Sequence, residues 1–392
     1  MSEWKDGKLK DIGCKFLSGF AFKSSEYKNE GIPLIKIGNI QNRTVDINAS
    51  SDYVSEGVLN EKVSKYLLSD KDVLIAMTGQ GSVGRVGRLK LNKGERALLN
   101  QRVGKFICDE ENLNLGFLFY ILASDKYQDA LFNAGSGSGQ PNLSPELILD
   151  FEIPTPSYHE QTAIAEVLSS LDDKIDLLHR QNKTLEQLAE TLFRQWFVEE
   201  AEESWEERGL DEIAEFLNGL ACQKFPRKSG ETGLPVIKIK EMRTGITESS
   251  DWATADVPEK YIIENGDMLF SWSGSLDTVL WFGGKGVLNQ HLFKVSSSIY
   301  PQWFYYFWTQ FHLQEFKGIA DDKATTMGHI QRHHLSDAKV IVPTKEELQK
   351  MDETVNPIFQ KIKSNTQQIL TLTQLRDTLL PKLMSGEVRI NI

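Results

Sequence analysis

Two segments of the chain have residue types and spacing that could support chemistry, and the first is rich in glycine. Gly79-Gln-Gly81-Ser-Val-Gly84 formally matches the pattern with which many proteins hold a dinucleotide. In such proteins a helix begins directly after the glycines, and its N-terminus faces the pyrophosphate. The residues that follow in this chain, Arg85-Val-Gly-Arg-Leu-Lys90, are typical of a strand. We therefore expect a glycine-rich loop between two strands, with nucleotide binding as the minor alternative.

The second segment is rich in histidine, since His329, His333 and His334 lie close together in the sequence and His312 is near. Neither a cysteine pair nor a helical His-Glu signature accompanies them, so we expect no metal site. A loop that contacts phosphates or base edges, or one without a binding role, is favoured instead. The chain also has no Walker lysine motif, no Asn/Asp-Pro-Pro-aromatic motif of an amino-methyltransferase and no nucleophile elbow. We predict no catalytic residue, and a binding protein rather than an enzyme.

An internal repeat organises the chain. The nine residues from Ile32 to Ile40 are echoed by Leu234 to Met242 with four identities, and the eight from Leu99 to Phe106 are echoed by Leu288 to Val295, again with four. Further matches keep the same order: Trp4 with Trp205, Asp72-Val-Leu-Ile with Asp267-Met-Leu-Phe, and Thr191-Leu with Thr378-Leu. The chain is therefore a tandem duplication of about half its length.

Each copy has the same two parts. Short runs of β-branched and aromatic residues, such as Leu34–Ile37, Val73–Met77 and Val103–Cys108, alternate with Gly, Asn, Asp and Ser, which predicts short strands and long polar loops. A helical patch follows, at Leu115–Phe132 and at Tyr300–Phe316. A long helical pattern then begins after Pro156 or Pro343. We predict two strand-rich domains at residues 1–157 and 201–343, and two long helices at residues 158–200 and 344–392.

Both long helices carry an apolar stripe with a seven-residue period, which is typical of a coiled coil. We expect the two helices to form an antiparallel pair, in a mixed α/β (α+β) fold with two similar strand-rich domains. Asn365 lies on the stripe and either fixes the register of the pair or faces solvent. Pro357 and Pro381 predict a kink or an early end of the second helix. The stripe residues are Ile164, Leu171, Leu178, Leu185 and Leu192 in the first helix, and Ile358, Ile362, Asn365, Ile369, Leu372 and Leu379 in the second.

Composition restricts the class of protein. The 392 residues carry a formal charge of −11, but residues 158–208 alone hold 13 acidic against 5 basic side chains, so the two strand-rich domains are nearly neutral. Net charge therefore argues only against strong non-specific DNA binding. Three distant cysteines do not suggest a disulfide framework or a thiolate zinc site, and no apolar run approaches a membrane span. We expect a soluble, cytoplasmic protein without a membrane partner.

Polar residues in the predicted loops are of the types that hydrogen-bond base edges or phosphates. The two copies offer different sets on one repeated framework, as expected for two domains that read two different half-sites. Lys36 and Lys238 occupy matching places and are interpreted as common phosphate-binding or structural positions. The candidate DNA-binding residues are Lys36, Gln41, Arg43, Gln80, Ser82, Arg85, Gln101, Arg102, Gln140 and Asn142 in the first copy, and Lys238, Lys240, Arg243, Ser273, Ser275, Gln290, His291, Lys323, Thr325 and His329 in the second.

Three further segments carry a resemblance over essentially the whole chain. They are Gly137-Ser-Gly-Gln-Pro-Asn-Leu-Ser144, Ile153-Pro-Thr-Pro followed by Glu160-Gln161 at the start of the leucine helix, and Leu379-Leu-Pro-Lys-Leu-Met-Ser-Gly-Glu-Val-Arg-Ile390. Together with the duplication, they resemble the specificity subunit of type I restriction-modification enzymes. The sequence departs from an even repeat where the second copy has Met327-Gly-His-Ile against Gln140-Pro-Asn-Leu in the first, so this loop is expected to act differently in the two halves.

The resemblance implies two target recognition domains, each reading one half of a bipartite sequence in double-stranded DNA. It further implies that the helices hold these domains apart and dock two modification (methyltransferase) subunits, which join restriction subunits in an endonuclease complex. The chain itself would need no cofactor, whereas its partners would use S-adenosylmethionine for adenine methylation, and ATP and Mg for restriction. The competing interpretation is a coiled-coil scaffold whose two globular domains bind protein partners.

Overall fold

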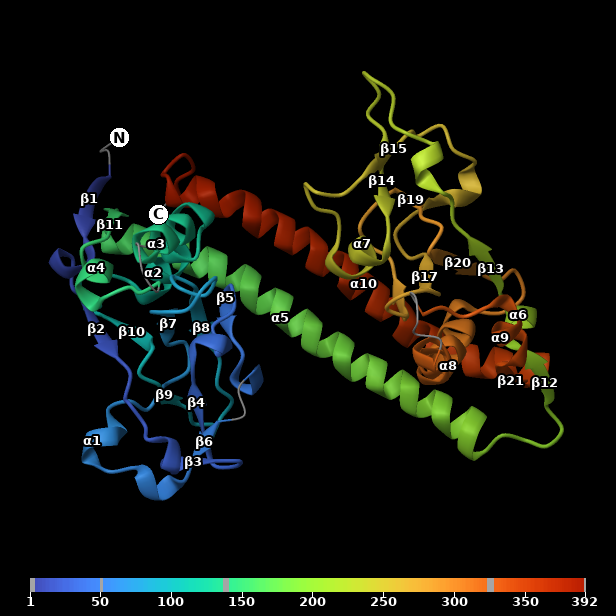
Figure 1. Ribbon diagram of the computed structural model, residues 1–392, viewed down its shortest axis with the longest axis horizontal. Coiled ribbons are helices and arrows are strands. Elements are labelled where there is room, and N and C mark those ends of the chain that lie inside the picture. Colours follow the sequence, from blue (N-terminus) through green and yellow to red (C-terminus); the bar gives the residue numbers. More distant parts are fainter. Residues whose placement is uncertain (1–3, 50–51, 137–140, 323–327, 391–392) are drawn as a thin grey trace. The chain divides into compact units, whose positions relative to one another are not determined.

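The computed structural model describes residues 4–49, 52–136, 141–322 and 328–390. The chain divides into two compact units, one formed by residues 1–174 with 373–392 and the other by residues 175–372. Each long helix therefore contributes one stretch to each unit (Figure 1). Across the described ranges, no helix combines the length and the apolar character needed to cross a bilayer.

In the first unit, three sheets and several short helices form the strand-rich part. A two-stranded sheet pairs β1 (Lys5–Lys8) with β11 (Glu152–Thr155). A five-stranded sheet has the order β2 (Cys14–Ser18), β10 (Val103–Cys108), β7 (Val73–Ala76), β8 (Val86–Leu89) and β5 (Arg43–Val45). A four-stranded sheet has the order β3 (Tyr27–Lys28), β6 (Tyr53–Val54), β4 (Ile32–Ile35) and β9 (Leu98–Leu99). The helices are α1 (Glu61–Ser64), α2 (Leu115–Leu122), α3 (Asp125–Gly135) and α4 (Pro145–Leu149).

The second unit repeats this plan. β12 (Glu206–Gly209) pairs with β21 (Lys339–Val342), and the main sheet has the order β13 (Glu215–Asn218), β20 (Leu292–Ser296), β17 (Met268–Ser271) and β18 (Asp277–Leu280). A further sheet has the order β15 (Trp252–Ala253), β14 (Leu234–Ile237), β19 (Gly286–Leu288) and β16 (Ile262–Ile263). The helices are α6 (Leu210–Ile213), α7 (Ile239–Thr244), α8 (Gln302–Asp322) and α9 (Arg332–Asp337). The order β13-β20-β17-β18 matches β2-β10-β7-β8, so the duplication seen in the sequence is also a duplication of topology.

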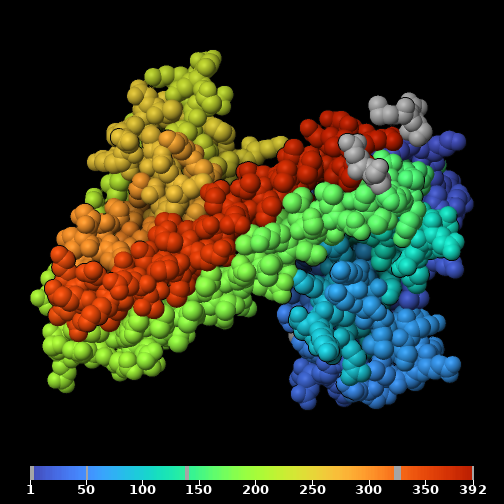
Figure 2. Space-filling view, turned by 180° about the vertical axis from the view of Figure 1, so that it is seen from behind, coloured from blue at the N-terminus to red at the C-terminus, as the bar shows by residue number. Residues whose placement is uncertain are grey.

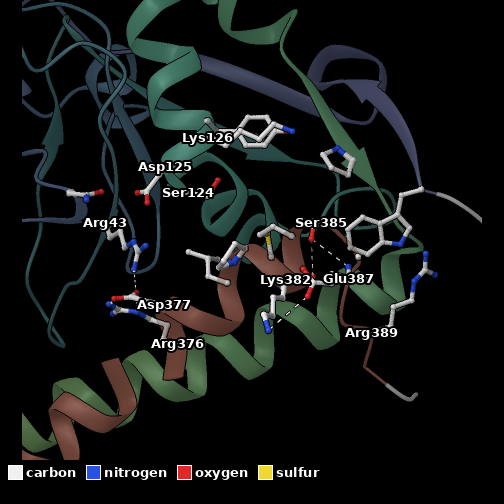
Figure 3. A pocket seen from close by; sticks show the side chains of 18 of the residues that line it. Arg43, Ser124, Asp125, Lys126, Arg376, Asp377, Lys382, Ser385, Glu387 and Arg389 are labelled. Carbon is white, nitrogen blue, oxygen red and sulfur yellow. Dashed lines mark hydrogen bonds and ion pairs between the residues drawn. The ribbon is translucent and has the colours of Figure 1, made fainter. Parts of the chain in front are cut away.

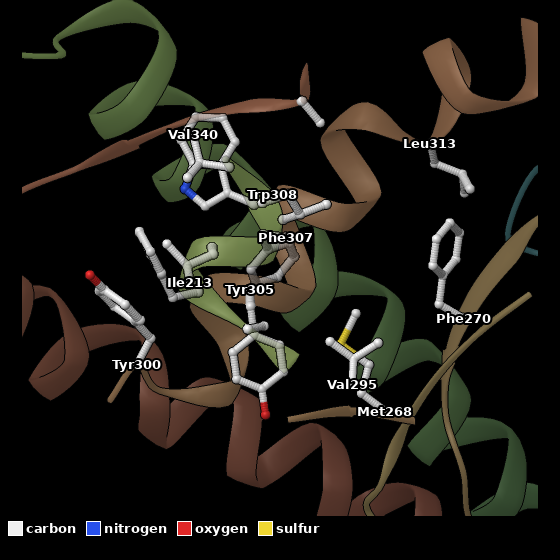
Figure 4. Close-up of a cluster of buried hydrophobic side chains, with 14 of the residues drawn as sticks. Ile213, Met268, Phe270, Val295, Tyr300, Tyr305, Phe307, Trp308, Leu313 and Val340 are labelled. Carbon is white, nitrogen blue, oxygen red and sulfur yellow. The ribbon is translucent and has the colours of Figure 1, made fainter. Parts of the chain in front are cut away.

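The central strand of each main sheet is buried on both faces. In β7, Val73 and Ile75 pack in one cluster with the aromatic residues of α2, whereas Leu74 and Ala76 pack in a second cluster with Ile35. A strand covered on both faces is expected to be an uninterrupted apolar run, as this one is. In the second unit the corresponding strand β17 contributes Met268 and Phe270 to a large aromatic cluster over α8 (Figure 4).

The two long helices, α5 (Tyr158–Arg194) and α10 (Lys345–Met384), pack together in opposite directions, and Figure 2 shows them side by side. Ile175, Leu178, Ile369 and Leu372 form a shared apolar cluster in the second unit. Ile164 and Leu178 are almost completely buried, as the stripe predicts, while Leu171, Leu185 and Leu192 are half-buried. Ile362 is also buried, and Ile358, Leu372 and Leu379 are half-buried.

Three details differ from the expectations for the helices. Asn365 is 0% exposed, so the interpretation that it faces solvent is wrong. α10 continues through Pro357 and Pro381, because both prolines lie on its exposed face, where water can reach the carbonyl groups that they leave without a partner. The second helix ends at Met384 and not near residue 392, since Gly386 adopts a left-handed backbone with φ 73°, as residues after a helix C-terminus often do.

Candidate nucleic-acid interface

In the first strand-rich domain, three loops from distant parts of the sequence meet where strand β7 ends. The backbone N–H of Met77, the residue after β7, donates to the carbonyl of Arg102 at 3.0 Å, and the N–H of Leu143 donates to the carbonyl of Met77 at 2.7 Å. Thr78 forms an isolated β-bridge with Asn142. The strand end is therefore flanked on one side by the turn before β10 and on the other by the segment before α4.

The second domain has the same arrangement at the end of β17. The N–H of Trp272 lies 3.4 Å from the carbonyl of His291, and the N–H of Ile330 donates to the carbonyl of Trp272 at 3.0 Å. Ser273 forms the matching β-bridge with His329. Candidate residues that are far apart in the sequence are thus brought together in each domain, and we call these two places the strand-end sites.

The first strand-end site presents amide and guanidinium groups to solvent. Gln80, Gln101, Arg102 and Asn142 are exposed. Ser82 and Arg85 belong to the same site and are half-buried. Such groups can donate to and accept from base edges, and arginine also binds phosphate.

The loop after β7 joins two antiparallel strands, because β7 pairs with β8. Its glycines Gly79, Gly81 and Gly84 all have positive φ, a backbone region that other residues rarely adopt. No helix begins after them in this part of the described chain, since β8 starts at Val86. The sequence prediction of a glycine-rich loop between strands is confirmed.

The second strand-end site is more buried and already internally hydrogen-bonded. Ser273 Oγ lies 2.9 Å from His291 Nδ1, and Gln290 Nε2 lies 3.4 Å from the other ring nitrogen of the same histidine. Ser273 is buried, whereas Ser275 is exposed and Gln290, His291 and His329 are half-buried. The two domains therefore present different chemistry on one framework.

Trp272 is a member of the second site that the sequence reasoning missed. Its Nε1 donates to Asn218 Oδ1 and to the carbonyl of Gln290, each at 3.1 Å. Its ring lies 5.9 Å from the His291 ring and meets the His329 ring edge to face at 6.2 Å. The repeat held the signal, because Asp267-Met-Leu-Phe matches Asp72-Val-Leu-Ile and so places Trp272 at the position of Met77, directly after the strand.

Six candidates lie elsewhere, between β4 and the start of β5 or from the N-cap of α7 to Arg243, and five of them contact other protein side chains. Lys36 Nζ pairs with Asp52 at 2.5 Å and lies 4.4 Å from the centre of the Tyr27 ring. Lys238 pairs with Asp251 in the same way, and this hydrogen bond holds the pKa of the Asp251 carboxyl below its ordinary value. The equivalence of the two pairs favours the structural interpretation of both lysines.

The other four of these residues are bound as follows. Gln41 Nε2 donates to the carbonyl of Gly38 at 2.9 Å, Arg43 pairs with Asp377 of α10 at 2.8 Å, Lys240 Nζ donates to Ser249 Oγ at 2.6 Å, and Arg243 lies 3.5 Å from Asp277. Their roles as DNA contacts remain predictions. Gln140, Lys323 and Thr325 were also predicted, and they lie outside the described residues.

The histidine-rich segment does not gather its side chains around one point. His312 is buried, and its Nε2 lies 2.8 Å from the carbonyl of Lys339 while its Nδ1 lies 3.1 Å from Glu315. His329 instead packs on Trp272, and His333 packs on His334 with ring centres 4.0 Å apart. Among the residues that the structure describes, no group of three His, Cys, Asp or Glu side chains could hold a metal ion.

Comparison with known proteins gives consistent matches along the chain. The family described as the type I restriction modification DNA specificity domain matches residues 1–187 and 202–374. The type I restriction enzyme MjaIX specificity subunit of Methanocaldococcus jannaschii is 28% identical, with 99% of this chain and 94% of the relative covered. The HindI specificity subunit of Haemophilus influenzae is 23% identical, with 99% and 100% covered. The crystal structure of a type I system S subunit from M. genitalium has the same fold, with a TM-score of 0.64, 17% identity, and 97% and 96% of the two chains covered.

Proposed function

The chain belongs to the type I restriction-modification DNA specificity family, and from this premise we propose how it reads DNA. It is the DNA specificity subunit of such a system rather than a catalytic subunit. Each strand-rich domain reads one half of a bipartite target in double-stranded DNA. The surface that reads bases is the strand-end site of each domain. The observation that carries this proposal is the matching geometry of the two sites with different polar residues on each.

Direct reading of DNA requires side chains that complement base edges in a groove. Gln101, Arg102 and Asn142 of the first site are exposed and lie on loops anchored to a buried strand, so they can reach a groove from a rigid support. The second site offers Gln290 and His291 from the equivalent turn. Because these pairs differ while the backbone contacts around them are the same, the two domains are suited to two different half-sites.

The helices α5 and α10 are proposed to set the number of unread base pairs between the half-sites. A helix rises about 1.5 Å per residue, and B-DNA rises about 3.4 Å per base pair along each strand, so one heptad corresponds to about three base pairs. The buried contacts between α5 and α10, centred on Leu178 and Ile369, support this role because they hold the two helices together.

The proposed partners are two modification subunits that dock on the helices, together with restriction subunits. The chain needs no cofactor of its own in this scheme, while the partners use S-adenosylmethionine, ATP and Mg. The near neutrality of the two domains favours weak DNA binding by the free chain, with high affinity only in the assembled complex. We place this complex in the cytoplasm, where its DNA target lies.

The decisive experiment is methylome sequencing of cells that express the chain with its modification subunit, compared with cells that lack the chain. A new methylated-adenine motif with two short half-sites around a fixed spacer is expected. The double variant Gln101→Ala/Arg102→Ala should change base preference in one half-site only, and Gln290→Ala/His291→Ala in the other. Lys93→Ala, an exposed residue of the loop between β8 and β9, is the matched control and should leave the motif unchanged. Assembly of the complex without any new motif would favour the scaffold interpretation instead.

The spacer role has its own test. Deleting residues 179–185 together with residues 362–368 removes one heptad from each helix and keeps opposing contacts matched, and it should change the preferred spacer by about three base pairs. Deleting only one of the two heptads should disrupt the helix pair. An unchanged spacer in the double deletion would refute the idea that the helices measure it.

A further inference from the structure

A chain of charged and polar side chains joins the first recognition domain to both long helices within the first unit. Arg43, at the start of edge strand β5, donates to Asp377 of α10 at 2.8 Å. Arg376 also binds Asp377, and its other nitrogen donates to Asp172 of α5 at 2.8 Å. Asp172 in turn accepts a hydrogen bond from the Tyr120 hydroxyl of α2 at 2.6 Å. Figure 3 shows Arg43 and Asp377 pointing toward each other, with Arg376 beside them.

Most of this chain of contacts is shielded from solvent. The side chains of Arg376, Arg43 and Asp172 are 16%, 20% and 22% exposed, respectively, whereas that of Asp377 is 47% exposed, so salt screens the Arg376–Asp172 pair less than the Arg43–Asp377 pair. Burial alone would raise the pKa of Asp377, but the hydrogen bonds from Arg376 and Arg43 outweigh it and hold that pKa below its ordinary value. The carboxylate is therefore charged, and available to both arginines, at neutral pH.

The backbone of Arg43 is strained, and comparison with the equivalent residue of the second copy shows this. Its φ is 67°, in the left-handed region that residues with a Cβ rarely adopt. The matching segments Ile32–Ile40 and Leu234–Met242 place Gly245 at the equivalent position, with φ 78°. The second copy thus uses a glycine at this turn, and the first uses an arginine despite the cost. Such strain persists where surrounding contacts hold the residue, and it is concentrated at functional positions.

The second copy makes the equivalent junction with apolar residues. Thr191 matches Thr378, and the same separation of 187 residues relates Asp172 to Phe359 and Arg376 to Ala189. Phe359 and Ala189 are buried, and Phe359 contacts Phe307 of α8 with ring centres 6.2 Å apart. Phe307 is also 187 residues from Tyr120, which is the residue that meets Asp172. At this matching position, the second domain contacts the helices through aromatic packing, whereas the first uses charges in addition to the apolar cluster that α2 shares with Leu168 and Leu380.

We propose that Arg43 is a positioning residue, which acts through Asp377 to fix the orientation of the first recognition domain on the helix pair. Aromatic packing is short-ranged but insensitive to salt, whereas a pair of charges is directional and can be weakened by salt or acid. The contact starts at β5, which is the edge of the main sheet, and that sheet also carries the first strand-end site. A shift of β5 relative to α10 would therefore move the surface that reads the first half-site.

The direct test is hydrogen exchange on the full-length chain, in low and high salt, for the amides of β5 and of the last turns of α10. Arg43→Gly removes the guanidinium and relieves the left-handed strain, and Asp377→Asn removes the charge of its partner. Each should speed exchange in both segments by about fivefold in low salt, with a smaller effect in high salt. Arg43→Asn, which tolerates the left-handed region but carries no charge, should exchange as fast as Arg43→Gly.

Arg243→Gly is the matched control, because Arg243 pairs with Asp277 of its own domain and not with a helix. It should leave exchange in the helices unchanged. Unchanged exchange in Arg43→Gly and Asp377→Asn would overturn the proposal. So would wild-type exchange in Arg43→Asn, because the charge of Arg43 would then be unnecessary.

A second readout separates orientation from simple stability, and it rests on the proposed bipartite target. In the assembled complex, Asp377→Asn, which leaves the candidate DNA-binding residues intact, should relax the spacer that is accepted while leaving the base preference of both half-sites unchanged. Strict retention of the wild-type spacer by this variant would also contradict a positioning role. If the wild-type complex itself shows no fixed spacer, the proposed function fails, while the exchange experiment still decides the role of Arg43.

Discussion

Two asparagines are buried between α5 and α10 in the second unit, and replacing one of them with leucine should stabilise the helix pair. Asn182 Nδ2 donates to Thr366 Oγ1 at 3.0 Å, whereas the hydrogen bond from Asn365 Nδ2 to Gln181 is long, at 3.5 Å. The Oδ1 atoms of Asn182 and Asn365 are both buried and find no donor among the described residues. A buried acceptor without a donor costs about 1–3 kcal/mol.

The equivalent position of the first long helix is occupied by leucine. Asn365 is separated by 187 residues from Leu178, which is 1% exposed and packs with Ile369. Asn365→Leu removes a desolvated amide that has one weak hydrogen bond and adds apolar surface, so we expect a gain of about 1–2 kcal/mol. The reciprocal variant Leu178→Asn loses about 2 kcal/mol of apolar burial and leaves an amide poorly paired, for a total loss of about 3–5 kcal/mol.

Native-state hydrogen exchange of the α10 amides near residue 365 is the appropriate assay, since a chain of two units need not unfold in one step. A gain of about 1.4 kcal/mol corresponds to tenfold slower exchange. Faster exchange in Asn365→Leu would refute the reasoning, because it would mean that the amide contributes more through its contacts than it costs by burial. Leu178→Asn must exchange faster in the same experiment, which controls for disturbance of the helix pair by any substitution.

Three further predictions concern the two units separately. Phe359→Ala should destabilise the second unit by about 3–5 kcal/mol in a denaturant titration, since Phe359 is 2% exposed and leaves a cavity against Phe307. The pKa of Asp377 is lowered in the folded state, so the stability contributed by its carboxylate is complete above the unfolded-state pKa of about 3.9 and is lost as pH falls through the folded-state pKa. Exchange of the β5 amides should therefore accelerate below about pH 4 in the wild type, and less in Asp377→Asn. Trp272→Phe keeps an aromatic ring but loses the hydrogen bonds to Asn218 and Gln290, so methylome sequencing should show weaker discrimination in one half-site, with a stability loss near 1 kcal/mol.

The strands and their order could be anticipated where local pattern and burial agree. The run from Val103 to Cys108 is a strand over its whole predicted length, and the long helix predicted from residue 158 begins at Tyr158. The patch predicted as one helix at Leu115–Phe132 is divided in two, because Ser124 has an extended backbone, with its hydroxyl donating to the carbonyl of Ile121, and the second helix begins at Asp125. That signal was present in the sequence, as a Ser-Asp pair within the helical pattern.

The partners of the charged residues could not be anticipated in the same way. Arg376 interrupts the apolar stripe of α10, and Arg43 lies in a segment that the sequence predicts as a polar loop, so neither residue alone identifies Asp172 or Asp377 as a partner. These contacts join residues more than 200 positions apart, and no local periodicity encodes them. The sequence also does not decide whether Asn365 is buried. Its burial depends on which residues of α5 face it, and the apolar stripe alone does not specify those residues.

The contacts that the two copies share explain how one framework can carry two different sites. In both units a tryptophan before the first strand hydrogen-bonds a glutamate at the start of a long helix, Trp4 with Glu160 and Trp205 with Glu347. In both, a lysine of the main sheet pairs with an aspartate directly before the central strand, at 2.6 Å for Lys105 and 2.8 Å for Lys294. These contacts lie within the framework, whereas the side chains that differ most project from the loops at the strand ends. Substitutions at the strand ends leave the buried strand and its ion pair intact, so the residues proposed to read DNA can change with little effect on folding. One contact with the helices differs as well, since Arg43 of the first domain pairs with Asp377 of α10 while Phe307 of the second domain packs on Phe359 of α10, so a domain moved from one position to the other should keep its base preference but not its orientation.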